Sequence, residues 1–230
     1  MDHLRWDLWN IFRLAVQDRM ITHSPAEMLF TPRTTPSPSR QVLTPQQVQI
    51  ILSVLDLREQ LIVQLALFSG MRPGEILALQ WKHVAEDHLD VVHRLYRGKL
   101  DRPKSERSKR KVALSLGTRR LIQQWRQHEA PSNLDAWMFP SANADTPLGR
   151  DNTWRRLIAP KLEAVELGWA TFQIMRRTHA SLARERGIDP KLVADQLGHG
   201  LGVNLDVYTV AALDQRQRAV QTVEAAMLVH

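Results

Sequence analysis

The sequence contains no cysteine, and only two of its 230 residues are tyrosine. Without cysteine, neither a disulfide nor a thiolate-bound metal can hold the fold together, and a reducing compartment suits the chain. No apolar run approaches the roughly 20 residues that a membrane-spanning helix needs. The amino terminus lacks the basic-then-apolar order of a secretory signal. We therefore expect a cytoplasmic protein with no membrane association.

Acidic residues are scarce relative to basic ones. The chain has 24 Asp and Glu against 31 Lys and Arg, which leaves a net charge of +7 at pH 7. This excess favours a polyanionic partner, most simply nucleic acid, although a merely soluble basic protein has the same balance. A hydrophobic content of 43% is typical of a globular protein that buries a sizeable core.

Two composition changes near the amino end predict a domain boundary. Residues 3–20 place apolar side chains on one stripe of a helix, at Leu4, Leu8, Ile11, Phe12, Ala15 and Val16. Residues 30–41 are rich in Pro, Ser and Thr, which is typical of an extended linker. We therefore expect 1–29 to be the last helix of an earlier domain, 30–41 a linker, and 42–230 a second domain.

The second domain is predicted to be α+β and mainly α-helical. Helix start and stop signals, such as Thr44-Pro45 and Gly70, predict helices from residue 44 and over 58–69, 118–129, 152–167, 170–186, 190–197 and 213–227. Pro73 suits a further helix start, with Arg72 at its cap. Strand-forming residues predict a small antiparallel sheet from 89–96 and 111–114, with short additions at 81–84 and 138–140.

A basic run lies between the two main strands. From residue 97 to 111 only Asp101 and Glu106 oppose eight basic residues, namely Arg97, Lys99, Arg102, Lys104, Arg107, Lys109, Arg110 and Lys111. A solvated hairpin would account for such a run. The density of basic side chains in this run favours contact with a phosphate backbone, because each lysine or arginine placed on a phosphate releases counterions.

A second group of polar residues follows in the stretch 171–208. It offers an arginine pair at Arg176 and Arg177, a Leu-Gly-His turn at His199, and one of the two tyrosines, Tyr208. A tyrosine hydroxyl becomes a useful nucleophile when positive charge and donors surround the group that it attacks. Arg72, at a helix amino terminus, could also bind an anion, although a surface pair with Glu75 is the commoner fate of such an arginine.

Four motifs in this order resemble the tyrosine recombinase (phage integrase) family. They are FSGMRPGEILALQW at 68–81, PKSERSKRKVAL at 103–114, RRTHASL at 176–182 and LGHGLGVNLDVY at 197–208. Each motif alone is weak, but their order and spacing fit the whole catalytic domain of that family. The resemblance implies the tyrosine-recombinase catalytic fold and site-specific recombination of DNA.

The resemblance also implies a role for each site residue. Tyr208 would attack the scissile phosphate, leaving a 3′-phosphotyrosyl bond and a free 5′-hydroxyl. Arg72 and Arg176 would clamp the non-bridging oxygens, with Glu75 as their support. Lys104 would give a proton to the departing 5′-oxygen, and His199 would hydrogen-bond the phosphate. This chemistry needs no cofactor and no metal, and the sequence offers neither a P-loop nor a clear carboxylate cluster for magnesium.

One position departs from the family pattern. Gln173 stands where a histidine usually lies three residues before the second arginine. Glutamine can donate a hydrogen bond to a phosphate oxygen, but it cannot exchange protons near neutral pH. Arg177 points about 100° away from Arg176 on a helix, which indicates a structural or DNA-backbone role.

The resemblance has further implications for partners and for rival functions. It implies double-stranded DNA, a homotetramer on paired sites and accessory DNA-bending proteins, in a bacterial or phage setting. Because residues 1–29 match only the end of the family's core-binding domain, a shortened or degenerate integrase is one alternative. A DNA-binding module without catalysis, built on residues 181–199, is another, and a type IB topoisomerase is a third.

Overall fold

A computed structural model describes residues 2–30, 41–101 and 109–198. Contacts along the backbone divide the chain into two compact units, residues 1–40 and 41–230. The boundary falls at the end of the expected linker, whose residues 31–40 lie outside the described part. The assignment of 1–29 to a core-binding domain remains a prediction.

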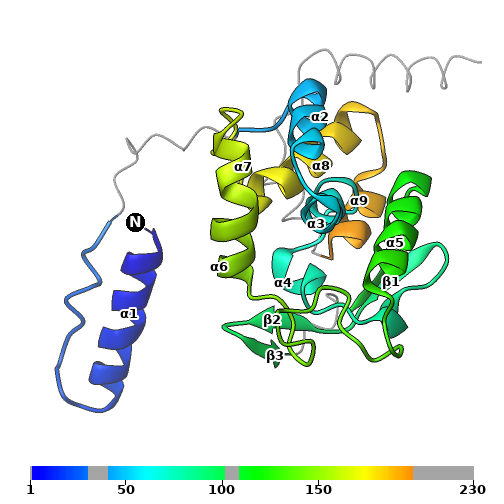
Figure 1. Ribbon diagram of the computed structural model, residues 1–230. Coiled ribbons are helices and arrows are strands. Elements are labelled where there is room, and N and C mark those ends of the chain that lie inside the picture. Colours follow the sequence, from blue (N-terminus) through cyan, green and yellow to red (C-terminus); the bar gives the residue numbers. More distant parts are fainter. Residues whose placement is uncertain (1, 31–40, 102–108, 199–230) are drawn as a thin grey trace, which may run out of the picture. The chain divides into compact units, whose positions relative to one another are not determined.

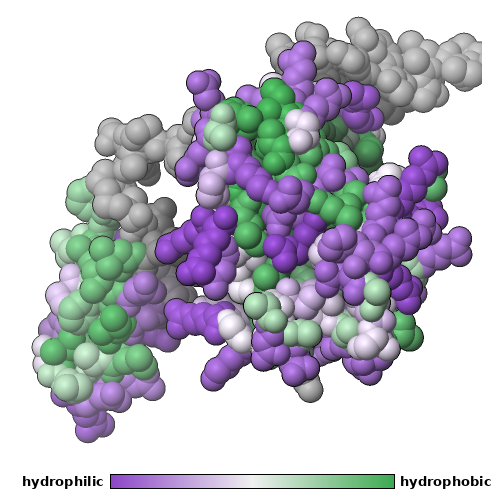
Figure 2. Space-filling view, viewed as in Figure 1, coloured by the Kyte–Doolittle hydropathy of each residue, from purple (hydrophilic) through white to green (hydrophobic). Residues whose placement is uncertain are grey.

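The first unit contains one long helix, α1 (Asp2–Gln17), which the apolar stripe predicts. The stripe is only partly covered: Leu4 and Ile11 are exposed, and its other members are half-buried, namely Leu8, Phe12, Ala15 and Val16. Apolar surface is accordingly visible along α1 in the space-filling view (Figure 2). Helices of this kind are normally stabilised by burying such a face.

The second unit begins with α2 (Pro45–Ser53) and α3 (Leu57–Phe68). Thr44 and Gln47 form the predicted capping box, in which each side chain accepts a hydrogen bond from the other residue's backbone N–H. Helix α3 is buried on nearly every side and forms the centre of the unit (Figure 1). Each fully buried Leu or Ile of α3 contributes about 2 kcal/mol of hydrophobic stabilisation.

A short helix, α4 (Pro73–Ile76), follows the turn at Gly70 as predicted, with Arg72 at its N-cap. The expected strand at 81–84 is wrong, because Trp81–His83 forms the 3₁₀ turn η1. Only isolated bridges flank this turn, Gln80 with Trp137 and Val84 with Leu89. The buried side chain of Trp81 fixes η1 in the core.

The strands form two separate antiparallel ladders instead of one sheet. The predicted continuous strand 89–96 is broken into β1 (His88–Val91) and β2 (Arg94–Tyr96). β1 pairs with β4 (Arg110–Ala113), and β2 pairs with β3 (Lys99–Asp101). The β2–β3 hairpin is therefore an insertion between the two strands of the first ladder. Only β1 and β4 carry buried apolar residues, which explains why the ladders separate.

Helix α5 (Leu116–Glu129) matches its prediction, buries Ile122 and Trp125, and packs against α3. The loop that follows carries Met138 and Phe139 into the core. The brief strand expected at 138–140 is absent from the described residues, where Pro140 forms only a single bridge with Pro147. Two prolines at this bridge leave no N–H groups to extend a ladder.

The helix predicted over 152–167 is interrupted. It consists of α6 (Arg150–Asn152), the π-helical segment η3 (Thr153–Ile158) and α7 (Ala159–Glu163). Pro160 has no N–H for the regular helical hydrogen bond, and this favours a change of register before it.

The second unit's described part ends with α8 (Phe172–Glu185) and α9 (Pro190–Leu197), both as predicted. Thr171 and Asp189 accept hydrogen bonds at their amino ends, and Gly198 closes α9 at φ +69°. The helices surround α3, and the strands gather at one end of the unit (Figure 1). The α+β, mainly helical class is confirmed. Among the described residues no helix has the length and apolarity to cross a membrane.

Candidate active site

Arg72 lies at the N-cap of α4, where the chain turns after Gly70. Its backbone N–H donates to Glu75 Oε2 at 3.0 Å, and its Nη1 donates to Glu75 Oε1 at 2.7 Å. Its Nη2 lies 3.4 Å from the carbonyl oxygen of Gly198. The side chain is still 40% exposed. These contacts hold Arg72 in place, and the exposed part of its side chain remains accessible to a ligand.

Glu75 is the most deeply buried charged group of this region, with a side chain that is 4% exposed. Burial acts to raise its pKa. Hydrogen bonds and the positive charge from Arg110, together with those from Arg72, outweigh burial and hold the pKa of Glu75 below its ordinary value. Glu75 is therefore an ionised carboxylate near neutral pH, shared between two guanidinium groups. The pair with Glu75 that the sequence left as a surface alternative for Arg72 is a partly buried contact.

Arg176 comes from α8, far along the chain, and is only 7% exposed. Its Nη1 donates to the carbonyl oxygen of Gly70, and its Nη2 donates to that of Leu197 at 2.6 Å. Carbonyl acceptors satisfy a buried guanidinium without neutralising its charge. Two backbone carbonyls thus hold the Arg176 guanidinium inside the protein.

The two arginines meet at one turn. Arg176 donates to Leu197 and Arg72 donates to Gly198, so their guanidinium groups bond to consecutive carbonyls at the end of α9. Arg176 also bonds to Gly70, two residues before Arg72. The structure thus brings Arg72, Glu75 and Arg176 together, as the predicted site requires.

Two side chains that the sequence analysis gave no role support this turn. His179 Nδ1 lies 3.0 Å from the Leu67 carbonyl oxygen, and its ring packs on Gly70, where a Cβ would lie 3.1 Å from it. Burial, and then the charge of Arg176, lower the pKa of His179 against the opposing effect of the Leu67 carbonyl, so its ring is neutral at pH 7. The position of His179, one turn after Arg176 on a helix, is the sequence signal for this contact.

Gln196 is the other supporting side chain. Its Nε2 donates to the carbonyl oxygens of Ala113 at 3.0 Å and Ser69 at 3.3 Å, and its Oε1 accepts from the Ala113 N–H. The last turn of α9 is thereby fixed to β4 and to the end of α3. No pattern in the sequence distinguishes Gln196 from a solvated glutamine.

The structure leaves part of the predicted site untested. Gln173 is exposed in the first turn of α8, and Arg177 is half-buried beside Arg176. The remaining predicted residues lie outside the described part of the chain, namely Arg102, Lys104, Arg107, His199 and Tyr208. Their roles stay predictions.

Two parts of the basic run 97–111 are described, namely residues 97–101 and 109–111. Arg97 and Lys99 are exposed there, and so is Lys109, which precedes β4. Arg97 and Gly98 both have positive φ angles, of 49° and 75°, as a two-residue hairpin turn requires. The guanidinium carbons of Arg94 and Arg97 lie 5.2 and 5.4 Å from the ring centre of the exposed Tyr96.

The sequence predicts that Arg110 contacts DNA, but the structure places this residue in the protein interior. Its side chain is only 6% exposed, and it faces Glu75 instead of solvent. Nη2 donates to Glu75 Oε2 at 2.9 Å, and Nε donates to the Gln196 carbonyl oxygen at 2.8 Å. Alternation along β4 explains the placement, because Arg110 and Val112 point to the same, inward side of the strand.

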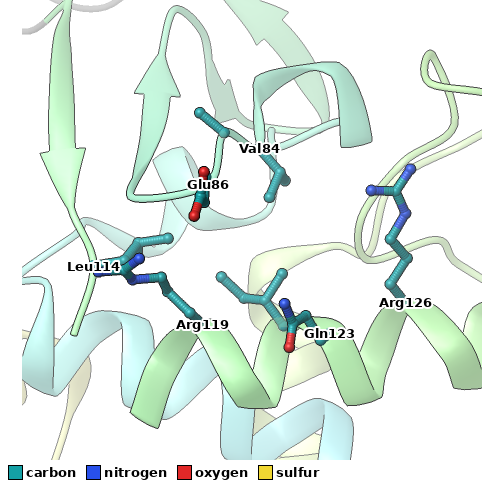
Figure 3. A pocket seen from close by; sticks show the side chains of 8 residues that line it. Val84, Glu86, Leu114, Arg119, Gln123 and Arg126 are labelled. Carbon is teal, nitrogen blue, oxygen red and sulfur yellow. The ribbon is translucent and has the colours of Figure 1, made fainter. Parts of the chain in front are cut away.

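A pocket of about 200 Å³ lies elsewhere on the unit (Figure 3). Arg119, Gln123 and Arg126 rise from one face of α5, and Val84 and Glu86 lie across from them. Its lining residues include none of Arg72, Glu75, Arg110 and Arg176. The described residues contain no group of His, Asp or Glu arranged to hold a metal ion.

Two fixed guanidinium groups that converge on one turn, one of them accessible, form a site suited to a single anion with several oxygens. Arginine stays charged at all relevant pH values, and its planar fork matches phosphate geometry. Such groups also stabilise charge that develops on a phosphate during displacement. The described part of the site therefore has electrostatics suited to binding a phosphate group.

Comparison with known proteins identifies the family of the chain. The Phage integrase family matches residues 41–213. Since this is well over half of the chain, the protein belongs to the phage integrase family. The ICEBs1 integrase of Bacillus subtilis (strain 168) is 24% identical over 229 residues, covering 90% of this chain and 60% of that protein. The chain thus spans less than two thirds of that relative's length.

Solved structures show the same fold. The Tn1549 transposon integrase in complex with transposon right end DNA has a TM-score of 0.78 and 21% identity, covering 97% of this chain and 78% of that one. A lambda integrase dimer bound to a COC′ core site has a TM-score of 0.63 and 18% identity, covering 93% of this chain and 59% of that one. The predicted tyrosine-recombinase catalytic fold is confirmed.

Proposed function

We propose that this chain is a site-specific recombinase that cleaves and rejoins double-stranded DNA through a 3′-phosphotyrosyl intermediate. The observation that carries the proposal is the convergence of Arg72 and Arg176 on consecutive carbonyls of one turn, with Glu75 ionised beneath them. Family membership and the DNA complexes of the Tn1549 and lambda integrases support DNA as the partner.

In the proposed reaction the Tyr208 oxygen attacks the scissile phosphorus, and the bond from phosphorus to the 5′-oxygen breaks. Arg72 and Arg176 stabilise the negative charge on the non-bridging oxygens as the bond order changes. Lys104 supplies the proton that the departing 5′-oxygen takes up, while His199 and Gln173 hydrogen-bond the phosphate. The Tyr208 proton leaves to water or to a neighbouring base.

The energy of the broken phosphodiester is conserved in the phosphotyrosyl bond. Attack by a 5′-hydroxyl therefore reverses the step and rejoins the DNA without ATP or a metal. Exchange between two duplexes needs paired sites, so we propose a homotetramer on DNA, assisted by accessory DNA-bending proteins, in the cytoplasm of a bacterium.

The contacts to DNA that surround the site are proposed for exposed basic residues. Arg97, Lys99 and Lys109 would neutralise backbone phosphates next to the cleavage point, together with Arg102, Arg107 and the half-buried Arg177. Such contacts position a protein on a duplex and supply salt-dependent affinity without reading sequence.

A nicked suicide substrate tests the proposal. Loss of the short fragment beyond the nick prevents religation, so the covalent protein–DNA complex accumulates and resists denaturation in detergent. We expect this complex with the wild-type chain and none with Tyr208→Phe, which should bind DNA with unchanged affinity. Binding without any covalent complex would favour a DNA-binding module built on α8 and α9. Relaxation of supercoiled DNA without paired sites would favour a topoisomerase.

A further inference from the structure

Arg110 uses all three of its side-chain nitrogens inside the protein. Nη1 and Nη2 donate to the two oxygens of Glu75, at 3.2 and 2.9 Å, in a bidentate pair. Nε donates to the Gln196 carbonyl oxygen at 2.8 Å. This single side chain therefore connects β4 to Glu75 on α4 and to the last turn of α9.

The same guanidinium also packs against the turn that Arg72 and Arg176 share. Gly198 has a φ of +69°, and a Cβ at this position would lie 2.8 Å from Arg110 Nη1. The backbone can come this close only because residue 198 has no side chain. Arg110 thus forms one wall of the turn, next to the carbonyl oxygen that accepts from Arg72.

The charges in this cluster give Arg110 a second effect. Among the described residues, the charged groups that face Glu75 are Arg72 on its own helix and Arg110 from β4. One carboxylate cannot neutralise two guanidinium groups, so the trio keeps a net charge of +1. With Arg110 absent, Glu75 and Arg72 alone would sum to zero, and the attraction of Arg72 for an anion would weaken.

Burial makes this dependence stronger. A carboxylate that is 4% exposed is costly to ionise unless donors and positive charge surround it. Arg110 is the largest source of both for Glu75, and Arg72 is the smaller one. Without Arg110 the carboxyl group would take up a proton at a higher pH and lose its hold on Arg72.

We propose that Arg110 is a positioning residue of the phosphate site, which holds Glu75 and the 196–198 turn so that Arg72 and Arg176 present their guanidinium groups to the same phosphate. The inference rests on the proposed recombinase function. Arg110 acts through Glu75 and the turn, and does not itself touch the DNA.

The test is the variant Arg110→Met, which fills similar space without charge or donors. With the nicked substrate at pH 7.5 we expect covalent complex to form about 100-fold more slowly, as misplacement of a positioned group by about 1 Å can cause. DNA affinity should stay within about twofold, because a buried side chain releases no counterions.

The pH profile separates this role from a merely structural one. In Arg110→Met the rate should fall further as the pH is lowered, since Glu75 becomes protonated at a higher pH than in the wild type. The double variant Glu75→Gln/Arg110→Met should be slow but should lack this additional fall. Arg120→Ala, which removes an exposed charge from α5, should behave as the wild type.

Folding of each variant is checked by thermal unfolding. If Arg110→Met does not fold, Arg110→Lys decides the question, because lysine keeps the charge but cannot bridge both Glu75 and Gln196. We then expect covalent complex to form about 10-fold more slowly. A wild-type rate in Arg110→Lys would overturn the inference in that case.

Failure of this inference is distinguishable from failure of the proposed function. A wild-type chain that forms no covalent complex contradicts the function. A wild-type chain that reacts, with Arg110→Met equally fast at every pH, contradicts only the role of Arg110. Titration of Glu75 by NMR with ¹³C-labelled glutamate needs no activity, and a pKa unchanged by Arg110→Met would overturn the inference in either case.

Discussion

Arginines in two regions of this protein have opposite surroundings. In the arginine cluster, defined here as Arg72, Arg110 and Arg176 with Glu75, each guanidinium bonds to named acceptors, and two of the three side chains are nearly buried. In the β2–β3 hairpin, Arg97 and Lys99 are exposed, and only Arg94 is half-buried, beside Asp101, on strands that carry no buried side chain.

The difference shows that basic residues have two separate roles in this protein. An arginine whose donors are fixed by the fold is pre-organised. A ligand can therefore interact with its positive charge without the entropic cost of ordering the side chain. An exposed basic side chain is mobile and screened by salt, and it contributes affinity in proportion to the phosphates that it meets. The cluster should therefore control rate, and the hairpin should control binding.

Arg176→Lys should break the cluster and give the largest effect. Lysine has no fork to reach the carbonyls of Gly70 and Leu197 together while presenting a donor to phosphate. We expect the rate of covalent complex formation on a nicked substrate to fall about 100- to 1,000-fold, as for removal of a donor that stabilises developing charge. The exposed Arg120→Lys serves as control. A loss of DNA affinity without loss of rate would contradict the assignment.

Gly74→Ala should disturb the contact between α4, which carries part of the arginine cluster, and β2 of the hairpin. A Cβ on Gly74 would lie 2.6 Å from the carbonyl oxygen of Leu95, so α4 and β2 would have to separate. We expect a loss of about 1–3 kcal/mol in the free energy of unfolding, as for overpacking elsewhere, measured by chemical denaturation.

The matched control for this variant is Gly117→Ala in α5. The nearest atom to its new Cβ would be Gln64 Nε2 at 3.9 Å, an ordinary contact. Alanine there should stabilise the helix by up to about 1 kcal/mol. Equal stability changes in the two variants would mean that α4 and β2 do not pack as described.

Lys99→Ala tests whether the hairpin contributes to DNA binding without contributing to stability. Because Lys99 is exposed in β3, its removal should leave the free energy of unfolding within about 0.5 kcal/mol. The slope of log affinity against log salt should decrease by about 1, if one phosphate contact is lost. Lys99→Arg should keep the wild-type slope in the same binding titrations. An unchanged slope in Lys99→Ala would remove this residue from the DNA interface.

His179→Asn should have the smallest effect, seen only through pH. Burial lowers the pKa of His179 below its ordinary 6.5, so the unfolded chain binds this proton more readily than the folded one. The stability from neutral His179 is therefore complete above pH 6.5 and decreases as the pH falls below it. Melting temperatures between pH 7.5 and 5.5 should decline less steeply in His179→Asn than in the wild type.

The exposed His128→Asn is the control and should keep the wild-type decline. Some decline should persist in His179→Asn as well, because burial also lowers the pKa of His83. A decline identical to that of the wild type would show that His179 is not the group that takes up the proton.

Most helices could be predicted because their signals are local. The capping box at Thr44, the proline after Arg72 and the glycine after Leu197 each fix a helix end through a few neighbouring atoms. The strands were predicted less well, since the sequence of 89–96 is equally strand-forming throughout. In the structure β1 buries Leu89 and Val91 fully, whereas no residue of β2 is more than half-buried.

The sequence by itself determined that Arg72 caps a helix, that Arg176 lies on another, and that a basic hairpin stands between them, because each follows from short-range patterns. Tertiary structure alone decided that Glu75 is shared by two arginines and that Arg110 turns inward to it. Residues 75, 110 and 196 are far apart in sequence, and no local pattern specifies which carbonyl or carboxylate a buried guanidinium will meet. That choice depends on the packing of β4 against α9 and α4, where each nitrogen of the Arg110 side chain finds an acceptor.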